Sequence, residues 1–172
     1  MEIRSAQRPP ADNFRAMIAR PATPDDADEL VRLRAVLLTS MNLPNWDDDW
    51  QKPTRESLTD RLTPPFQTLA AFVIDRPDAP GLAACAVGTI EHRLGAPGDP
   101  HGRTGYVFSV ATHPDMRRRG FSRQCMTALL DWFRSQGVRK VDLRASAEAE
   151  PLYRSLGFTR TPDPAMRLRL DP

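Results

Sequence analysis

The segment Gly-Tyr-Val-Phe-Ser-Val-Ala-Thr-His-Pro-Asp-Met-Arg-Arg-Arg-Gly-Phe-Ser-Arg, residues 105–123, decides the interpretation of this chain. Its apolar first part ends at Pro114, which predicts a strand followed by a turn. An amphipathic segment begins after Gly120, so we expect a helix to begin there. The first N–H groups of a helix lack internal partners and lie at the positive end of the helix dipole. A strand that reaches a helix N-terminus through an arginine- and glycine-containing turn therefore predicts an anion-binding site.

The segments after Gly120 predict a crossover unit. Apolar side chains recur on one face of the helix, namely Phe121, Cys125, Ala128, Leu129, Trp132 and Phe133, and Gly137 ends it. Residues 138–145 alternate between apolar and charged side chains, which is typical of a strand. A strand, a helix and a second strand in this order predict two parallel strands with a right-handed connection. We also expect a short helix over residues 149–156, followed by a hairpin from residues 158–160 and 166–170.

The first half of the chain predicts shorter elements. Thr23 and Pro24 are typical of a helix start, and leucines recur at helical spacing after them. The other expected elements are a first strand at 14–19, a helix at 54–62 and largely apolar strands at 68–75 and 81–91. Apolar strands of this kind are usually covered on both faces. The sequence thus predicts an α/β fold with mixed strands and helices on both faces of the sheet.

Length and composition favour one domain. The chain has 172 residues, so we expect a single domain over residues 14–172 and a flexible extension over residues 1–13. Its net charge of only +2 gives no general attraction to nucleic acid, and we expect no nucleic-acid partner. No segment is apolar enough to span a membrane, and no signal peptide is evident, so we expect a cytoplasmic protein without a membrane partner. Cys85 and Cys125 fit no metal-binding spacing, so we expect two reduced core thiols and no metal.

The loop at residues 42–53 carries two tryptophans on either side of three aspartates. One interpretation is a solvated acidic turn whose rings pack against the core. The other is the edge of a substrate site, where Trp46 and Asp47 attract a cation such as an amine. The sequence leaves both interpretations open.

Two motifs in the second half resemble those of the GNAT superfamily of N-acetyltransferases. The family pattern is Gln/Arg-x-x-Gly-x-Gly/Ala, and Arg117-Arg118-Arg119-Gly120-Phe121-Ser122 stands in its place, with Ser122 departing from the last position. Residues 152–158, Leu-Tyr-Arg-Ser-Leu-Gly-Phe, resemble the family segment Leu-Tyr-x-x-x-Gly-Phe. The resemblance covers about residues 103–158. It implies a mixed, mostly antiparallel sheet with a central parallel strand pair.

The resemblance implies that the anion is the pyrophosphate of the co-substrate acetyl-CoA. Backbone N–H groups in the turn would hold it, and the side chains of Arg118 and Arg119 are candidates for phosphate contacts. Val110 and Thr112 would pair through their backbone with the pantetheine arm. The expected cofactor-binding residues are Val110, Thr112, Arg117, Arg118, Arg119, Gly120, Phe121 and Ser122.

For catalysis, the resemblance implies that a neutral amine attacks the thioester and that Tyr153 protonates the leaving sulfur. A backbone N–H near Val110 would stabilise the developing oxyanion. The strand over residues 103–112 has no carboxylate, so Glu91 is the first candidate for the base, followed by the aspartates at 47–49. A water chain through Ser109 or Tyr106 is the remaining choice. Trp46, Asp47 and Ser109 are the candidate acceptor residues.

Three functions follow from these residues. The first is an N-acetyltransferase that acts by direct attack on a primary amine of a small molecule or peptide. The second is a catalytically silent protein of the same fold that binds acyl-CoA as a sensor or interaction module. The third, a nucleic-acid binder that uses the three arginines, is disfavoured because the basic run is short and no aromatic residues interleave it. The sequence leaves the oligomeric state open; dimers are common for such folds, so a homodimer is suggested by analogy alone.

Overall fold

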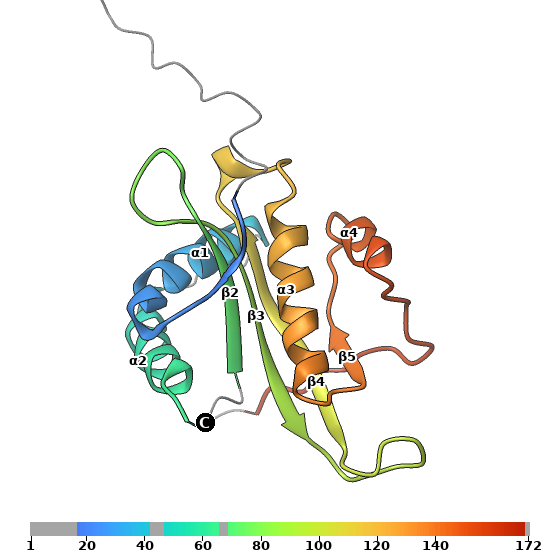
Figure 1. Ribbon diagram of the computed structural model, residues 1–172. Coiled ribbons are helices and arrows are strands. Elements are labelled where there is room, and N and C mark those ends of the chain that lie inside the picture. Colours follow the sequence, from blue (N-terminus) through green and yellow to red (C-terminus); the bar gives the residue numbers. More distant parts are fainter. Residues whose placement is uncertain (1–16, 42–46, 66–68, 171–172) are drawn as a thin grey trace, which may run out of the picture.

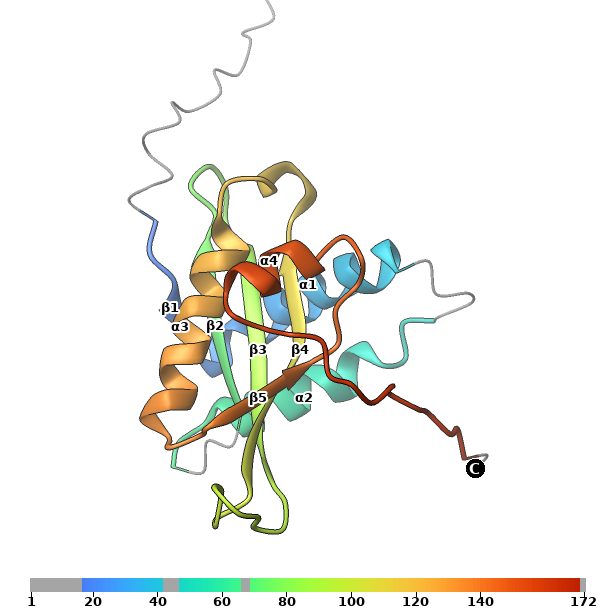
Figure 2. The ribbon, with the colours of Figure 1, turned by 90° about the vertical axis from the view of Figure 1, so that its right-hand side faces the viewer.

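A computed structural model describes residues 17–41, 47–65 and 69–170 of the chain. A single sheet lies between two helical layers (Figures 1 and 2). The helices α1 (Ala27–Ser40) and α2 (Gln51–Leu62) cover one face, and α3 (Phe121–Ser135) covers the other. The short helix α4 (Glu150–Ser155) lies in front of the upper part of the fourth strand in Figure 2.

The sheet has five strands in the order β1-β2-β3-β4-β5. They are β1 (Arg20–Pro21), β2 (Leu69–Asp75), β3 (Leu82–His92), β4 (Arg103–Thr112) and β5 (Lys140–Leu143). The first three pairings are antiparallel, and β4 pairs with β5 in parallel, as the crossover unit predicts. This parallel pair lies at the edge of the described sheet and not at its centre, because no described strand follows β5.

The start of α1 follows from its local sequence. Thr23 is the N-cap of a short 3₁₀ turn, Pro24–Asp26, and forms a capping box with Asp26. Both side-chain oxygens of Asp26 also accept hydrogen bonds from the guanidinium of Arg20, which lowers the pKa of Asp26. The predicted start at Thr23 is confirmed, with one turn of 3₁₀ helix before the α-helix.

Two glycines set how closely α3 approaches the sheet. A Cβ on Gly88 would lie 2.7 Å from the Phe133 ring, and one on Gly105 would lie 2.9 Å from it. A larger residue at either position would therefore clash with the Phe133 ring. This packing fixes α3, and with it the turn that precedes α3, against β3 and β4.

Three predicted elements differ from the structure. The first strand is Arg20–Pro21, and the described part of the predicted segment, residues 17–19, is not a strand. The second helix begins at Gln51 and not at residue 54, because Pro53 fits within the first turn of a helix. The predicted hairpin after α4 is wrong, since residues 158–170 form no strand and Met166, Leu168 and Leu170 are more than 80% exposed. The predicted extension at residues 1–13 lies outside the described residues.

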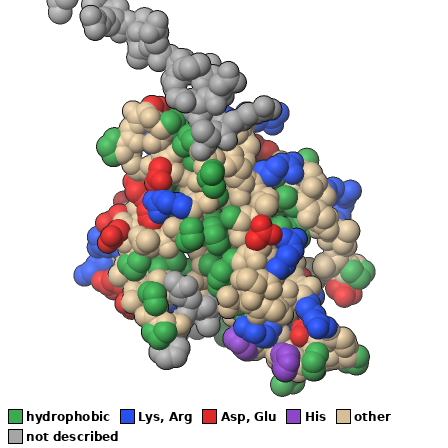
Figure 3. All heavy atoms as spheres, viewed as in Figure 1, with side chains coloured by type: hydrophobic (Ala, Val, Ile, Leu, Met, Phe, Trp, Pro, Cys, Tyr) green, Lys and Arg blue, Asp and Glu red, His purple; other side chains and the backbone are tan. Residues whose placement is uncertain are grey.

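Each face of the sheet has its own apolar core, and each cysteine lies in one of them. Cys125 lies in the core under α3 and Cys85 in the core under α1 and α2. Both are free thiols, and burial raises the pKa of Cys85 to about 12. On the face seen in Figure 3, acidic and basic side chains are interspersed over the described part of the chain.

Candidate active site

The central feature of the site is the separation of β4 from β5. The two strands pair from Thr104 with Lys140 to Val107 with Leu143, and β4 then continues alone to Thr112. The backbone groups of Phe108–Thr112 that point away from β3 therefore have no strand partner among the described residues. An open strand edge of this kind accepts an extended ligand as an additional strand.

A β-bulge in β4 lies at the point where the strands separate. Val87 pairs with Ser109 and Gly88 pairs with Val107, so Phe108 is an extra residue on β4. In an unbroken strand, Val107 and Ser109 would face the same side of the sheet. Instead, Val107 lies in the core under α3, whereas Ser109 faces the side of α1 and α2. The bulge thus divides the side chains of β4 between two sides of the molecule.

The turn between β4 and α3 has the backbone of an anion site. Gly120, the N-cap of α3, has a φ of 81°, and Arg118 has a φ of 63°. Successive residues near these conformations direct backbone N–H groups into one concave region. No side-chain hydrogen bond caps the N-terminus of α3, which is the positive end of the helix dipole. A left-handed conformation at Arg118 costs about 1 kcal/mol, and such strain is typical of functional turns.

An ion-pair cluster holds this turn in place. Arg76, at the end of β2, donates to Asp115 over 2.8 Å, and His113 also contacts Asp115. The Arg76 guanidinium, followed by His113, lowers the pKa of Asp115 to about 2. The carboxylate therefore stays ionised at neutral pH and anchors the turn to the sheet.

A groove of about 470 Å³ follows the open edge of β4 from this turn to α4. We call it the β4 groove; the residues that line it from β4, the turn, α3 and α4 include Val110, Thr112, Arg117, Arg118, Gly120, Phe121, Ser122, Arg123, Leu152 and Tyr153. Seven of the eight predicted cofactor-binding residues thus lie together. Arg119 does not line the groove, and its guanidinium donates to the Asp115 carbonyl at 3.0 Å. Arg123, which the sequence reasoning missed, takes a place in the groove.

Ser122, which departs from the family pattern, has a structural partner. Its hydroxyl lies 2.7 Å from the Thr112 hydroxyl, so the first turn of α3 is linked to the end of β4. The serine therefore fits without disturbing the turn.

Tyr153 lies at the α4 end of the groove. Its ring is 7% exposed and packs edge-on against Phe158, with ring centroids 5.9 Å apart. Burial raises the pKa of Tyr153, so the phenol is protonated at neutral pH. Within the described residues its hydroxyl has no hydrogen-bond partner, and it remains free to donate to a ligand.

A second cavity, of about 360 Å³, lies beneath α1 and α2, beside the β4 residues that directly precede those of the groove. We call it the α2 cavity; it is lined by Leu30, Arg34, Trp50, Pro53, Thr54, Ser57, Leu58, Arg61, Leu69, Val87, Phe108 and Ser109. Phe108 and Ser109 connect it to the β4 groove, because Val110 lines the groove directly after them. The predicted acceptor residue Ser109 lies here, 3% exposed.

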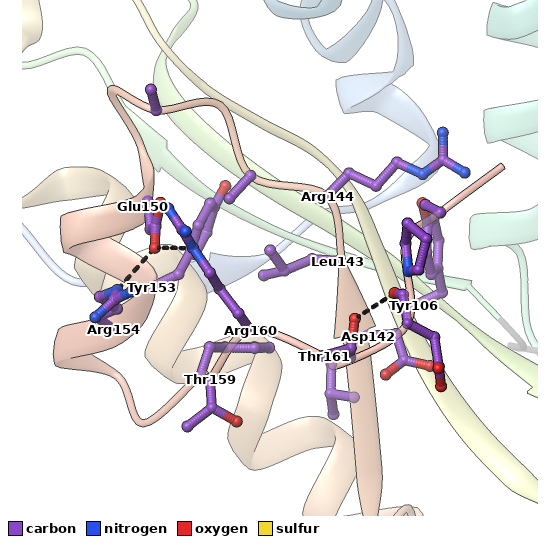
Figure 4. Close-up of a pocket in the computed structure, with 17 residues that line it drawn as sticks. Tyr106, Asp142, Leu143, Arg144, Glu150, Tyr153, Arg154, Thr159, Arg160 and Thr161 are labelled. Carbon is purple, nitrogen blue, oxygen red and sulfur yellow. Dashed lines mark hydrogen bonds and ion pairs between the residues drawn. The ribbon is translucent and has the colours of Figure 1, made fainter.

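A third cavity, of about 700 Å³, is bounded by β5, α4 and the C-terminal segment, and we call it the tail cavity (Figure 4). Glu150 accepts hydrogen bonds there from both Arg154 and Arg160, and these arginines lower its pKa to about 2. The pair with Arg160 attaches the C-terminal segment to α4. Tyr153 borders both this cavity and the β4 groove.

Three predicted residues do not join the site. Glu91 pairs with Thr104 at the opposite end of β4, about 20 Å from Val110 at the usual rise per strand residue, and its carboxylate is bound to Arg93 at 2.6 Å. Asp47 is exposed and accepts from the Asp49 N–H in a turn, outside all three cavities. Trp46 lies outside the described residues. The neighbouring tryptophan, Trp50, is the one that enters a cavity.

The described part of the chain gives no sign of a metal site or a membrane span. Among these residues, no cluster of three or more His, Cys, Asp or Glu side chains could hold a metal ion. None of the described helices combines the length and apolar character needed to cross a membrane.

A mostly antiparallel sheet, whose last two strands are parallel and separate beside the turn that precedes α3, is the architecture of an acetyltransferase fold. The model of the acetyltransferase (GNAT) family matches residues 36–158, more than half of the chain, and the chain belongs to this family. A comparison with curated protein sequences gives no significant match.

Solved structures agree with this fold. A predicted acetyltransferase from Clostridium acetobutylicum, solved with acetyl-CoA, is 23% identical with a TM-score of 0.75 over 90% of this chain and 96% of its own. A GCN5-related N-acetyltransferase from Ralstonia eutropha JMP134 is also 23% identical, with a TM-score of 0.74 over 89% and 99%. Glucosamine-6-phosphate N-acetyltransferase from Arabidopsis thaliana is 18% identical, with a TM-score of 0.69 over 91% and 99%. At these identities the likeness establishes the fold alone.

Proposed function

We propose that this protein transfers an acetyl group from acetyl-CoA to a primary amine. The observation that carries this proposal is the continuity of the β4 groove, which runs from the turn at Gly120 along an open strand edge to Tyr153. The two ends supply what such a co-substrate needs, namely N–H donors and arginines for phosphates and a proton donor for sulfur. One structural neighbour solved with acetyl-CoA and another solved with CoA support the same co-substrate.

Different residues of this chain bind different parts of acetyl-CoA. The N–H groups of the turn and of the first turn of α3, with Arg117, Arg118 and Arg123, face the phosphates. The open edge of β4 at Val110 and Thr112 offers hydrogen bonds to the extended arm. Bound acetyl-CoA supplies the acetyl group as a thioester; transfer forms a C–N bond and breaks the C–S bond.

Two groups along the β4 groove act on the reacting atoms. Tyr153 donates its proton to the departing sulfur, because its raised pKa keeps it neutral. A backbone N–H on the open edge near Val110 stabilises negative charge on the carbonyl oxygen. No carboxylate lines the α2 cavity among the described residues, so the acceptor reacts as the free amine. Ser109 is the buried hydroxyl beside it that passes the released proton to water. Glu91 has no part in this proposal.

The test measures acetyl-CoA binding by calorimetry and thiol release with a panel of primary amines. We expect micromolar binding and amine-dependent thiol release that yields an acetamide of matching mass. Binding with no turnover across a broad panel would instead favour the acyl-CoA sensor. The observation that supports the sensor is that no described carboxylate lines the α2 cavity. No binding of acetyl-CoA would reject both functions.

A cytoplasmic location and a homodimer stay predictions from the sequence.

A further inference from the structure

The α2 cavity carries a positive charge that nothing in the described structure neutralises. Arg34 and Arg61 line it, and no acidic side chain does. Arg61 donates to the Thr89 hydroxyl at 2.9 Å, whereas Arg34 has no hydrogen-bond or ion-pair partner among residues 17–41, 47–65 and 69–170. The two neighbouring segments outside the described residues, 42–46 and 66–68, contain no Asp or Glu. Within the described part of the chain, Arg34 is thus a cation without an ion-pair partner.

The contrast with the other arginines of α1 and α2 makes Arg34 unusual. Arg32 binds Glu29 at 2.7 Å, and Arg55 binds Asp28 at 3.2 Å. Arg34 lies on the same helix as Arg32, is half-buried, and borders an apolar cavity. Partial burial of a charge is unfavourable unless a partner compensates it. The guanidinium fork matches a carboxylate through two parallel hydrogen bonds.

The rest of the α2 cavity is mostly apolar, with hydroxyl side chains from Thr54, Ser57 and Ser109. Trp50 and Phe108 supply aromatic surfaces, and aliphatic side chains complete the wall, namely Leu30, Leu58, Leu69 and Val87. A volume of about 360 Å³ is at the small end of the usual range for ligand pockets. The cavity therefore suits one apolar or aromatic group and excludes a large polar molecule.

These features define a ligand class. Resting on the function proposed above, we infer that the acceptor is a small amino-acid-like molecule that binds in the α2 cavity. Its apolar or aromatic body contacts Trp50 and Phe108, its carboxylate binds Arg34, and its primary amine lies at the bulge of β4. A polycationic amine is disfavoured, because Arg34 and Arg61 repel it.

Binding of the acceptor in the tail cavity would predict a different charge preference. Its lining contains three acidic and three basic side chains, namely Asp142, Glu150, Asp163, Arg144, Arg154 and Arg160. An acceptor bound there would experience no net positive charge. The charge preference of the enzyme therefore distinguishes the two cavities.

The experiment compares matched acids and amides as acceptors in the thiol-release assay. The pairs are L-leucine, L-phenylalanine, L-tryptophan and 6-aminohexanoate with their carboxamides, and spermidine and kanamycin serve as polycations. The pair of 6-aminohexanoate and its amide distinguishes an α-amine from an amine far from the carboxylate. We expect at least one acid to exceed its amide in kcat/KM by about ten- to hundredfold, the range for a hydrogen-bonded charge.

Two variants assign the preference to Arg34. In Arg34→Gln the ratio of acid to amide should fall to within about threefold of unity, while acetyl-CoA affinity stays unchanged. Arg55→Gln removes the same charge from α2 outside the cavity and should retain the wild-type ratio. Calorimetry with N-acetyl-L-phenylalanine and its amide on the CoA complex provides a readout without turnover.

The outcomes separate the two proposals. If acetyl-CoA binds but amides or polycations are preferred, or no acid in the panel reacts or binds, the ligand class is wrong and the donor site still stands. An acid preference that survives in Arg34→Gln also overturns the inference. If acetyl-CoA itself does not bind, the proposed function fails.

Discussion

The β4 groove and the α2 cavity lie next to each other along one strand and differ in the groups they offer a ligand. The groove offers backbone groups of an open strand edge, of a turn with two left-handed residues and of a helix N-terminus, beside side chains from α1, α3 and α4. The cavity consists of side chains from α1, α2, β2, β3 and β4. Backbone groups are the same in every chain of this fold, whereas side chains differ at each position. The groove therefore suits a constant co-substrate, and the cavity suits a variable one.

If this division is correct, changes in the groove should affect every acceptor equally, and changes in the cavity should affect only the choice of acceptor.

The largest effect is expected for Tyr153→Phe. Removal of the proton donor should lower kcat about 10²- to 10⁴-fold for all acceptors. The affinity for acetyl-CoA should stay within about twofold, since the ring still packs against Phe158. Because burial raises the pKa of Tyr153, the wild-type rate should not decline from about pH 7 to about pH 9. An unchanged kcat in steady-state thiol release would remove Tyr153 from the mechanism.

Gly120→Ala should weaken acetyl-CoA binding about tenfold. A Cβ at this position would meet no atom within 4 Å, so the effect comes from the φ of 81°, which costs about 1–2 kcal/mol for a residue with a side chain. Calorimetry measures the dissociation constant. Gly98→Ala is the matched control, because Gly98 has a φ of 86° and equally open surroundings in a remote loop. Equal losses of CoA affinity in both variants would contradict a role for the turn.

Trp50→Leu should raise the KM of the preferred acceptor about fivefold through loss of aromatic contact area. The KM of acetyl-CoA should change by less than twofold, because Trp50 does not line the β4 groove. Thermal unfolding controls for stability, since Trp50 also packs against the core under α1 and α2. A parallel rise of both KM values would show that the two sites are not independent.

Ser122→Ala should have the smallest effect. It removes the 2.7 Å hydrogen bond to Thr112, which contributes about 0.5–1.5 kcal/mol to the free energy of unfolding. The dissociation constant of acetyl-CoA should change less than threefold. Denaturant unfolding of this variant, of Thr112→Val and of the double variant measures the coupling between the two hydroxyls. A large loss of CoA affinity in Ser122→Ala alone would assign the hydroxyl to the phosphates instead.

The same contrast explains how much the sequence predicted. Residues 105–123 are contiguous, so their strand, turn and helix, and the groove they form, followed from local rules. Arg34, Trp50 and Phe108 meet only in the folded chain, and no local pattern relates them. Glu91 was misplaced because the length of β3, which no motif specifies, puts it at the far end of the sheet. Alternation at residues 166–170 predicted a strand, but a strand also needs a partner, and none lies beside it among the described residues.

The extra residue in β4 also determines how this protein tolerates changes of length. Phe108 shifts the alternation of the strand by one position, so Ser109 and Ala111 face the side of α1 and α2, whereas Val110 packs on the side of α3 and Thr112 bonds to Ser122 of that helix. Deletion of a single residue here would exchange these two sets, as would an insertion, and both sites would be lost together. Substitutions in α1 and α2 carry no such risk. Evolution toward new acceptors is therefore expected to proceed by replacement in the helices, with the length of β4 held constant.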